Sequence, residues 1–254
     1  MGAATPLLRL DGVSKSFGKV TVARDLSLSV QPGEALGIVG PNGAGKSSLF
    51  AMIAGDLRPD SGAVWLEGRQ VTGVPPHART RAGIGRTFQV PRPFEHLTVF
   101  ENVLVCAHQG AALKGRRAQA YAMGVLERTG LAGLANTPAG RLALLPRKRL
   151  EVARALGTGP RLLLLDEVAG GLTEPEVAEL VTVIKDLHTE GLGIVWIEHV
   201  VHALIKTVSR MICLAGGDVV ADGEPLRVLA DRRVRELYLG AGPETGLPGE
   251  EDGS

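Results

Sequence analysis

The sequence predicts an α/β fold in which helices cover both faces of a mainly parallel β-sheet. Short segments made up almost entirely of apolar residues, such as 161–165 and 194–197, have the length and composition of buried strands. Amphipathic segments alternate with them, and in residues 175–190 apolar side chains recur at helical spacing. A glycine-rich loop at residues 40–48 joins an apolar strand to a helix. Strands that are apolar on both faces and alternate with helices are typical of a covered parallel sheet.

The first third of the chain is expected to be rich in strands around one helix. Residues 7–13, 26–30 and 35–39 are expected as strands, with turns at 31–34 and 58–62. A helix is expected over 48–54. A weakly alternating strand follows at 63–66.

The middle of the chain has a helical pattern that is broken by two loops, so we expect a helical subdomain of about residues 90–158 inserted into the sheet domain. Its expected helices are 99–108, 117–129 and 146–156. The later elements are expected to be strand 161–165, helix 175–190, strand 194–197, helix 200–208 and strands 211–214 and 219–221. Residues 1–240 are then one domain, and the tail at 241–254, rich in Gly, Pro and Glu, is expected to be disordered.

The glycine-rich loop indicates a nucleoside triphosphate with magnesium as the ligand. It follows the pattern G-x-x-x-x-G-K-[ST] and consists of Gly40, Pro41, Asn42, Gly43, Ala44, Gly45, Lys46, Ser47 and Ser48. Its glycines let backbone N–H groups surround phosphate, and the following helix adds its positive N-terminal end. Lys46 should reach the β- and γ-phosphates, and the Ser47 hydroxyl should bind Mg²⁺. The alternative is a glycine-rich turn without a ligand.

Polar side chains follow two of the predicted buried strands. Asp166 and Glu167 come after strand 161–165, where an Asp can hold Mg²⁺ and a Glu can polarise the attacking water. The alternative is a solvated turn. Glu198 and His199 end the strand 193–197, at the sheet edge where ligands bind. His199 could donate to the γ-phosphate or could be a structural histidine. Its spacing from His202 does not match His-Glu-x-x-His, so a metal pair is not favoured.

Composition limits the classes of partner and compartment. The 254 residues carry a net charge of +1, and aromatic residues make up 4%, so neither a basic stripe nor a base-stacking platform indicates nucleic acid. Two cysteines and the absence of a secretory signal at the amino terminus favour a reducing cytosol. Since no apolar run reaches the roughly 18–20 residues of a membrane span, any membrane role is expected to come through a partner.

Taken together, these residues resemble the ATP-binding subunit of an ABC transporter over about residues 7–240. The resemblance implies a RecA-like P-loop core with an antiparallel β subdomain and the inserted helical subdomain. It assigns adenine stacking to Phe17, Walker A to 40–48, and Walker B to 163–167. Gln89 matches the Q-loop glutamine and His199 the switch histidine. By resemblance, Glu167, His199, Gln89 and Lys46 are catalytic, and Ser47, Gln89 and Asp166 hold Mg²⁺.

Within that family, several stretches are similar to the ATPase subunits of branched-chain amino-acid importers. They are residues 83–89, 97–103, 197–199 and 235–240. Related subunits serve urea, other amides and hydrophobic solutes. The resemblance implies a cytoplasmic ATPase held on the inner face of the membrane by permease subunits, with a periplasmic solute-binding protein in the same system. The rival readings are an ABC ATPase that does not transport, an exporter of lipid, and a P-loop small-molecule kinase.

The family signature Leu-Ser-x-Gly-Gln is degenerate in this chain. Its positions hold Leu142, Ala143, Leu144, Leu145 and Pro146. In the family, the Ser hydroxyl and the Gly N–H contact the γ-phosphate held by the partner subunit. Ala143 removes the hydroxyl, and a lost charge-assisted hydrogen bond costs about 1.5–3 kcal/mol. Leu145 is expected to add bulk near phosphate, while Pro146 suits a first helical turn. We therefore favour a heterodimer with a second ATP-binding subunit over a homodimer.

Overall fold

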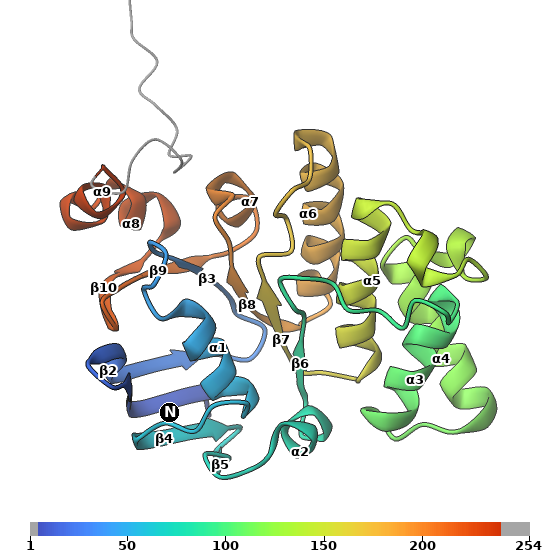
Figure 1. The fold of residues 1–254 in the computed structure, drawn as a ribbon, viewed down its shortest axis with the longest axis horizontal. Helices are drawn as coiled ribbons and strands as arrows, with labels where there is room; N and C mark the ends of the chain where they lie inside the picture. Colours follow the sequence, from blue (N-terminus) through green and yellow to red (C-terminus); the bar gives the residue numbers. More distant parts are fainter. Residues whose placement is uncertain (1–4, 240–254) are drawn as a thin grey trace, which may run out of the picture.

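The computed structural model describes residues 5–239, which form two sheets and a group of helices (Figure 1). The predicted disorder of residues 241–254 lies outside the described part. Within residues 5–239, no helix is both long enough and apolar enough to cross a membrane.

The larger sheet has six strands in the order β10-β9-β3-β8-β7-β6. Neighbouring strands in it are parallel, except that β9 and β10 are antiparallel. Its strands are β3 (Ala35–Val39), β6 (Ile84–Arg86), β7 (Leu162–Asp166), β8 (Gly193–Ile197), β9 (Arg210–Ala215) and β10 (Asp218–Gly223). The smaller sheet is antiparallel, in the order β2-β1-β4-β5. It consists of β1 (Leu8–Phe17), β2 (Val20–Val30), β4 (Ser61–Leu66) and β5 (Arg69–Gln70).

Most helices pack around the six-stranded sheet, and a separate group of three lies beside it. That group contains α3 (Val99–Gln109), α4 (Gly115–Arg128), α5 (Leu144–Gly157) and two short 3₁₀ turns, Ala132–Leu134 and Ala139–Arg141. The other helices are α1 (Lys46–Ala54), α2 (Pro76–Arg81), α6 (Glu174–Thr189), α7 (Val201–Ile205), α8 (Pro225–Ala230) and α9 (Arg232–Leu239). The predicted α/β fold with an antiparallel sheet and a helical insertion is confirmed.

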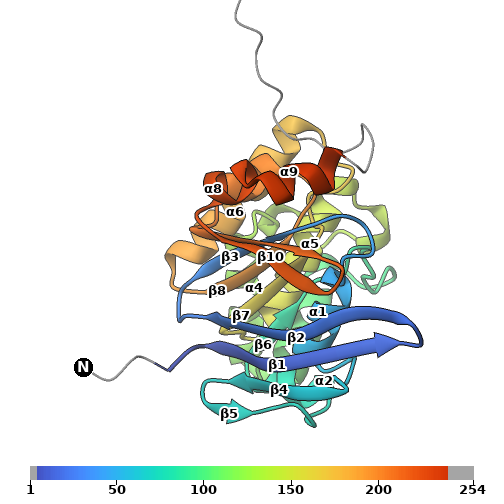
Figure 2. The same cartoon turned by 90° about the vertical axis from the view of Figure 1, so that its left-hand side faces the viewer.

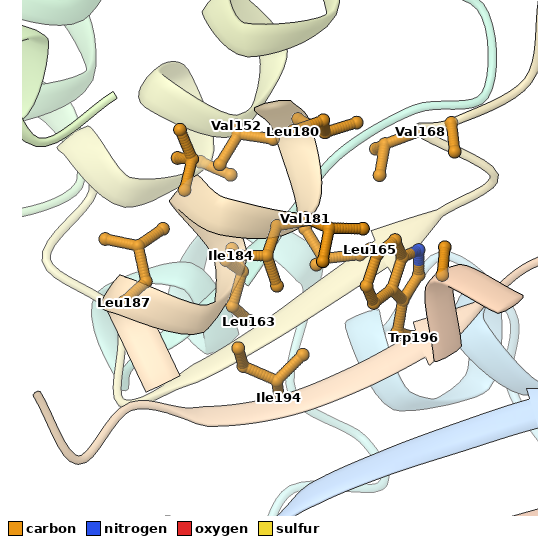
Figure 3. Close-up of a cluster of buried hydrophobic side chains, with 14 of the residues drawn as sticks. Val152, Leu163, Leu165, Val168, Leu180, Val181, Ile184, Leu187, Ile194 and Trp196 are labelled. Atoms are coloured by element: carbon orange, nitrogen blue, oxygen red, sulfur yellow. The ribbon is translucent and has the colours of Figure 1, made fainter. Parts of the chain in front are cut away.

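The six-stranded sheet separates two hydrophobic cores. Successive side chains of β7 enter opposite cores, Leu163 and Leu165 on one face and Leu162 and Leu164 on the other, because side chains alternate along a strand. On the first face, α6 covers β7 and β8. Its apolar stripe, which includes Val181 and Ile184, lies over the side chains of those strands (Figure 3).

The second face of this sheet differs from the prediction that helices cover both faces. Here α1 and the four-stranded sheet share one core, which contains Phe50 of α1 and Leu8 and Leu10 of β1. Figure 2 shows the small sheet on one side of the large sheet, with α6, α8 and α9 on the opposite side. The sequence pattern predicted strands in this part of the chain, but it did not indicate that they would cover one face of the larger sheet.

Several elements differ from the sequence prediction. The strands β1 and β2 extend into a hairpin, while β6, α2, α8 and α9 are elements that the patterns did not predict. A three-residue strand such as β6 is defined by pairing, here of Ile84 with Leu162, and not by local periodicity. The helix α7 is shorter than the predicted 200–208. The helix α5 begins two residues before the predicted start, because Ala143 is extended (φ −64°, ψ 172°) and Leu144 is already helical.

A buried arginine fixes the end of the helix that carries the glycine loop. The guanidinium of Arg79 is 1% exposed and donates to the carbonyls of Met52 and Ile53 at 2.7 and 2.8 Å. It also donates to the carbonyls of Thr72 and Val74, both at 2.9 Å. The last carbonyls of a helix have no partner within the helix, so Arg79 satisfies two that α1 leaves unpaired.

Candidate functional site

The glycine loop curves between the end of β3 and the start of α1. Gly40 (φ 148°) and Gly45 (φ 100°) have backbone angles that favour glycine. A Cβ on Gly40 would lie 2.1 Å from the Leu214 carbonyl oxygen, and one on Gly45 would lie 2.1 Å from that of Val22. A Cβ on Gly43, in contrast, would meet nothing within 4 Å. The loop is therefore packed tightly at its two ends and open at its tip.

The open side of the loop faces a pocket of about 180 Å³, which residues 42–48, Val22 and Glu167 line. Lys46 is buried, and its ammonium donates to the carbonyls of Gly40 at 2.6 Å and Pro41 at 3.1 Å. Burial lowers the pKa of Lys46, while the charges of Glu167 and Asp166 act in the opposite direction. Ser47 is exposed at the start of α1. An amine, a hydroxyl and a helix N-terminus around an open loop fit a chain of phosphates.

Asp166 is the last residue of β7 and lies in a buried, hydrogen-bonded position. Its carboxylate accepts from Arg86 at 3.2 Å, and its N–H donates to the Thr87 hydroxyl at 3.0 Å. Burial raises the pKa of Asp166. The Arg86 guanidinium lowers it, and the neighbouring Glu167 charge raises it further. Glu167, the next residue, lines the pocket, and two adjacent carboxylates are a set of oxygen donors that fits a divalent cation.

Glu167 is held from two sides by side chains that are distant in the sequence. Its Oε2 accepts from Gln89 Nε2 at 2.5 Å, and its Oε1 lies 2.9 Å from His199 Nε2. Its N–H donates to the Ile197 carbonyl at 2.9 Å, which fixes the residue against the end of β8. The backbone of Glu167 is left-handed (φ 48°), which is uncommon for a residue other than glycine. The structure thus brings together three of the predicted catalytic residues, and the fourth, Lys46, lines the same pocket as Glu167.

Two buried charged residues at this site were not assigned a role from the sequence. Lys148 of α5 donates to the carbonyls of Gln89 at 3.2 Å and Glu167 at 3.3 Å, so it ties the helical group to both residues. Burial lowers its pKa, against the charges of Glu198 and Glu167. No local pattern distinguishes Lys148 from the basic residues on either side of it. The only sequence feature that indicated a role for Glu198 was its position at the end of a predicted buried strand, now β8.

Glu198 is 2% exposed and accepts hydrogen bonds from the loops that follow β7 and β8. Its Oε1 accepts from the Ala169 N–H at 2.6 Å and from Trp196 Nε1 at 3.3 Å, and its Oε2 accepts from the His199 N–H at 3.2 Å. Burial raises the pKa of Glu198 to about 7, although these donors oppose the shift. Glu198 therefore links the segment after Glu167 to the segment that carries His199.

Phe17 lies at the end of β1 and does not line the pocket. The described residues that line the pocket include Val22 of β2 and do not include Phe17. The Phe17 ring is exposed, and Lys15 Nζ lies 5.4 Å from its centroid. The hairpin of β1 and β2 thus leaves the Phe17 ring uncovered, while Val22 of the same hairpin lines the pocket.

In the degenerate signature, the exposed leucine is not the one that we expected to lie near phosphate. Leu145 is 8% exposed and packs in the first core, so the expected bulk of its side chain near phosphate is wrong. Leu144 is 43% exposed instead, and its Cδ2 lies 3.5 Å from the position of a Cβ on Gly171. Ala143 precedes the helix without a side-chain hydrogen bond, and Pro146 occupies the first turn of α5, where a proline is tolerated.

A sequence profile described as "ABC transporter" matches residues 23–170, which include the glycine loop and both carboxylates. The chain belongs to the ABC transporter family. It is 35% identical over 250 residues to the high-affinity branched-chain amino acid transport ATP-binding protein LivG of Escherichia coli, covering 92% of this chain and 98% of LivG. It is 36% identical over 234 residues to the lipopolysaccharide export system ATP-binding protein LptB of Acidithiobacillus ferridurans, covering 92% and 97% of the two chains.

Solved structures of ABC ATP-binding cassettes have the same fold. One is the ADP conformation of MJ1267, an ATP-binding cassette of an ABC transporter, with a TM-score of 0.85, 30% identity and coverage of 92% of this chain and 99% of that chain. Another is a nucleotide-free cassette with a TM-score of 0.85 and 29% identity, covering 92% and 98% of the two chains. This chain is therefore an ATP-binding and ATP-hydrolysing subunit of an ABC transporter, and the rival reading of a small-molecule kinase is excluded.

Proposed function

We propose that this ABC ATPase hydrolyses MgATP with Glu167 orienting the attacking water, and so drives import of branched-chain or other hydrophobic amino acids. The observation that carries the catalytic part is the Glu167 carboxylate, held between Gln89 and His199 where it lines the pocket of Lys46. A carboxylate fixed in this way can accept a hydrogen bond from water and align it with the γ-phosphate. The Lys46 ammonium and the His199 ring offset the charge that develops on the transferred phosphoryl group.

The magnesium ion would be held by Ser47, Asp166 and Gln89. The adjacent carboxylates of Asp166 and Glu167 support this assignment, because burial and mutual repulsion make such a pair favour a cation. When bound, the ion neutralises phosphate charge and orients the phosphates. The replacement Glu167→Gln keeps the contacts that bind ATP but removes the carboxylate, so it should retain ATP without turnover. Turnover at the wild-type rate in that variant would remove Glu167 from the catalytic role.

A second, different ATP-binding subunit would complete the site. The signature segment of this chain presents the Leu144 side chain at its exposed edge and carries no hydroxyl at Ala143. Such a segment gives the ATP of a partner few hydrogen-bond donors. The P-loop of this chain, in contrast, matches its motif at every defined position. The test compares the ATPase rate of this chain alone with the rate after mixing with a paralogous subunit. A full rate from the isolated chain would contradict the heterodimer.

A permease would dock in the groove between α2 and α5. This groove of about 220 Å³ is lined by Phe88 and by charged residues, including Arg154 and Glu151. Phe88 and Phe94 are exposed, although the Arg154 guanidinium stacks on the Phe94 ring at 5.3 Å. Since Gln89 follows Phe88, a cytoplasmic segment of the permease in this groove could move the Q-loop. The alternative is that residues 91–94, which follow Gln89, are only a rigid loop. If the groove is the docking site, replacement of Phe88 by Asp should release the permease in a pull-down.

The solute is proposed from the relatives that are named for amino-acid transport. LivG and the Pseudomonas aeruginosa protein BraF are named for branched-chain amino acids, while LptB is named for lipopolysaccharide export, so lipid export is the second candidate. An importer would need a permease at the inner face of the membrane and a periplasmic solute-binding protein. Amino-acid import and lipid export are distinguished by measuring uptake of radiolabelled leucine into vesicles. The vesicles contain this chain and the permease that is encoded by a neighbouring gene. ATP-dependent release of lipid without leucine uptake would favour export.

A further inference from the structure

The first residue of the P-loop, Gly40, is held on both sides by buried groups. The Gly40 N–H donates to the Tyr238 hydroxyl at 2.9 Å, and the Gly40 carbonyl accepts from the Lys46 ammonium at 2.6 Å. Tyr238 is 6% exposed and lies in α9, 198 residues after Gly40. The last described helix of the chain thus touches the backbone at the point where β3 becomes the nucleotide-binding loop.

The helix α9 reaches this point because one of its faces is buried. Val234 and Tyr238, four residues apart, lie on the same side of the helix and both belong to the first core. At its start, Asp231 accepts from the Arg233 N–H at 2.8 Å and pairs with the Arg233 guanidinium at 2.9 Å. Figure 2 shows α9 beside α8, on the side of the large sheet opposite β1 and β2. The Tyr238 hydroxyl is therefore positioned by packing of the carboxyl-terminal helices.

We propose that Tyr238 is a positioning residue for ATP binding, and that through its hydroxyl the docking of α9 and the binding of nucleotide at the P-loop favour each other. The inference rests on binding of ATP at this loop. A P-loop lysine engages the β- and γ-phosphates, so Lys46 must release the Gly40 carbonyl when ATP binds. The hydrogen bond from the Gly40 N–H to the Tyr238 hydroxyl then remains. It keeps the base of the loop in place while the lysine changes partners.

Loss of the hydroxyl should weaken nucleotide binding, because the Gly40 N–H is buried. Without an acceptor, this peptide would relax to a conformation in which the N–H finds water, and ATP would have to reverse that change. The cost of leaving such a group unsatisfied corresponds to roughly 5- to 150-fold in affinity. By linkage, ATP should in turn stabilise the docked α9.

The chain offers a matched control, because it has two tyrosines. The Tyr121 hydroxyl donates to the Leu156 carbonyl at 3.0 Å, within the helical group and outside the lining of the nucleotide pocket. The variants Tyr238→Phe and Tyr121→Phe therefore each remove one hydroxyl that bonds to the backbone. A fluorescent ATP analogue gives the affinity of the full chain, and amide hydrogen exchange of residues 232–239 with and without ATP gives the coupling.

We expect ATP to slow exchange in α9 of the wild-type chain and of Tyr121→Phe. In Tyr238→Phe we expect affinity to fall about tenfold, turnover at saturating ATP to stay within about twofold, and the protection of α9 to disappear. Wild-type affinity or persistent protection in Tyr238→Phe would overturn the inference. If that variant does not fold, the wild-type measurement still decides, since unchanged exchange in α9 on binding ATP contradicts the coupling. A wild-type chain that binds no ATP would overturn the proposed function as well.

Discussion

Glu198 is the buried carboxylate that should make the stability of this protein depend on pH near neutrality. Burial raises its pKa from 4.5 to about 7, against the hydrogen bonds that it accepts from Ala169, Val200, Trp196 and His199. An acid whose folded pKa lies above its unfolded pKa binds more protons in the folded state between those two values. The protonated form therefore stabilises the fold below about pH 4.5, and this contribution is lost as pH rises through about 7.

The size of the effect follows from the two pKa values. Each pKa unit corresponds to about 1.4 kcal/mol, so the interval from 4.5 to about 7 amounts to about 3–4 kcal/mol over the full titration. Between pH 5 and pH 8.5 the free energy of unfolding should fall by about 2–3 kcal/mol because of this group. Glu198→Gln removes the titration but keeps the shape of the side chain.

The assay is urea unfolding of the wild-type chain and of Glu198→Gln at pH 5, 6, 7 and 8.5. Other titrating groups are common to both proteins, so they cancel in the difference. The free energy of unfolding of the wild type relative to the variant should decrease by about 2–3 kcal/mol from pH 5 to pH 8.5. A difference that stays constant over this range would refute the reasoning, because it would mean that Glu198 does not change its protonation between the folded and unfolded states in this interval.

Three further predictions test other parts of the structure. Glu167→Gln should bind ATP with near wild-type affinity but hydrolyse it at least 100-fold more slowly, measured by phosphate release; rapid turnover would contradict the role of Glu167. Gly45→Ala places a Cβ 2.1 Å from the Val22 carbonyl oxygen and should abolish nucleotide binding, measured by calorimetry. Gly43→Ala meets nothing within 4 Å, so it should lose only the roughly 1–2 kcal/mol that its left-handed backbone (φ 80°) costs a residue with a Cβ. Arg79→Met should cost about 3–4 kcal/mol in chemical unfolding, because it leaves four backbone carbonyls without their donor.

The sequence was most informative where the chemistry is local. The P-loop, the carboxylates at the end of β7 and His199 at the end of β8 were found because each follows an apolar strand, and the ends of parallel strands meet at one edge. The helical group and α6 were predicted from periodicity. The grouping of Gln89 with Glu167 came from a family resemblance, since nothing in the local pattern around residue 89 requires that contact.

The features that were missed depend on contacts between segments distant in sequence. Arg79, Lys148 and Tyr238 each bond to the backbone of another element, and the sequence around them does not record which carbonyl or N–H they meet. The exposure of Leu144 in place of Leu145 depends on where α5 begins, and that depends on the extended backbone at Ala143. A shift of the helix start by two residues was enough to exchange the two side chains.

The left-handed backbone of Glu167 has a consequence for how this ATPase can change by mutation. That conformation costs a residue with a Cβ about 1–2 kcal/mol, and glycine escapes most of the cost. A search for stabilised variants would therefore enrich replacements at position 167 that relieve the strain and remove the carboxylate. Proteins chosen for thermal resistance alone would then lose the carboxylate to which we assign the orientation of water, so stability and activity should be selected together in this chain.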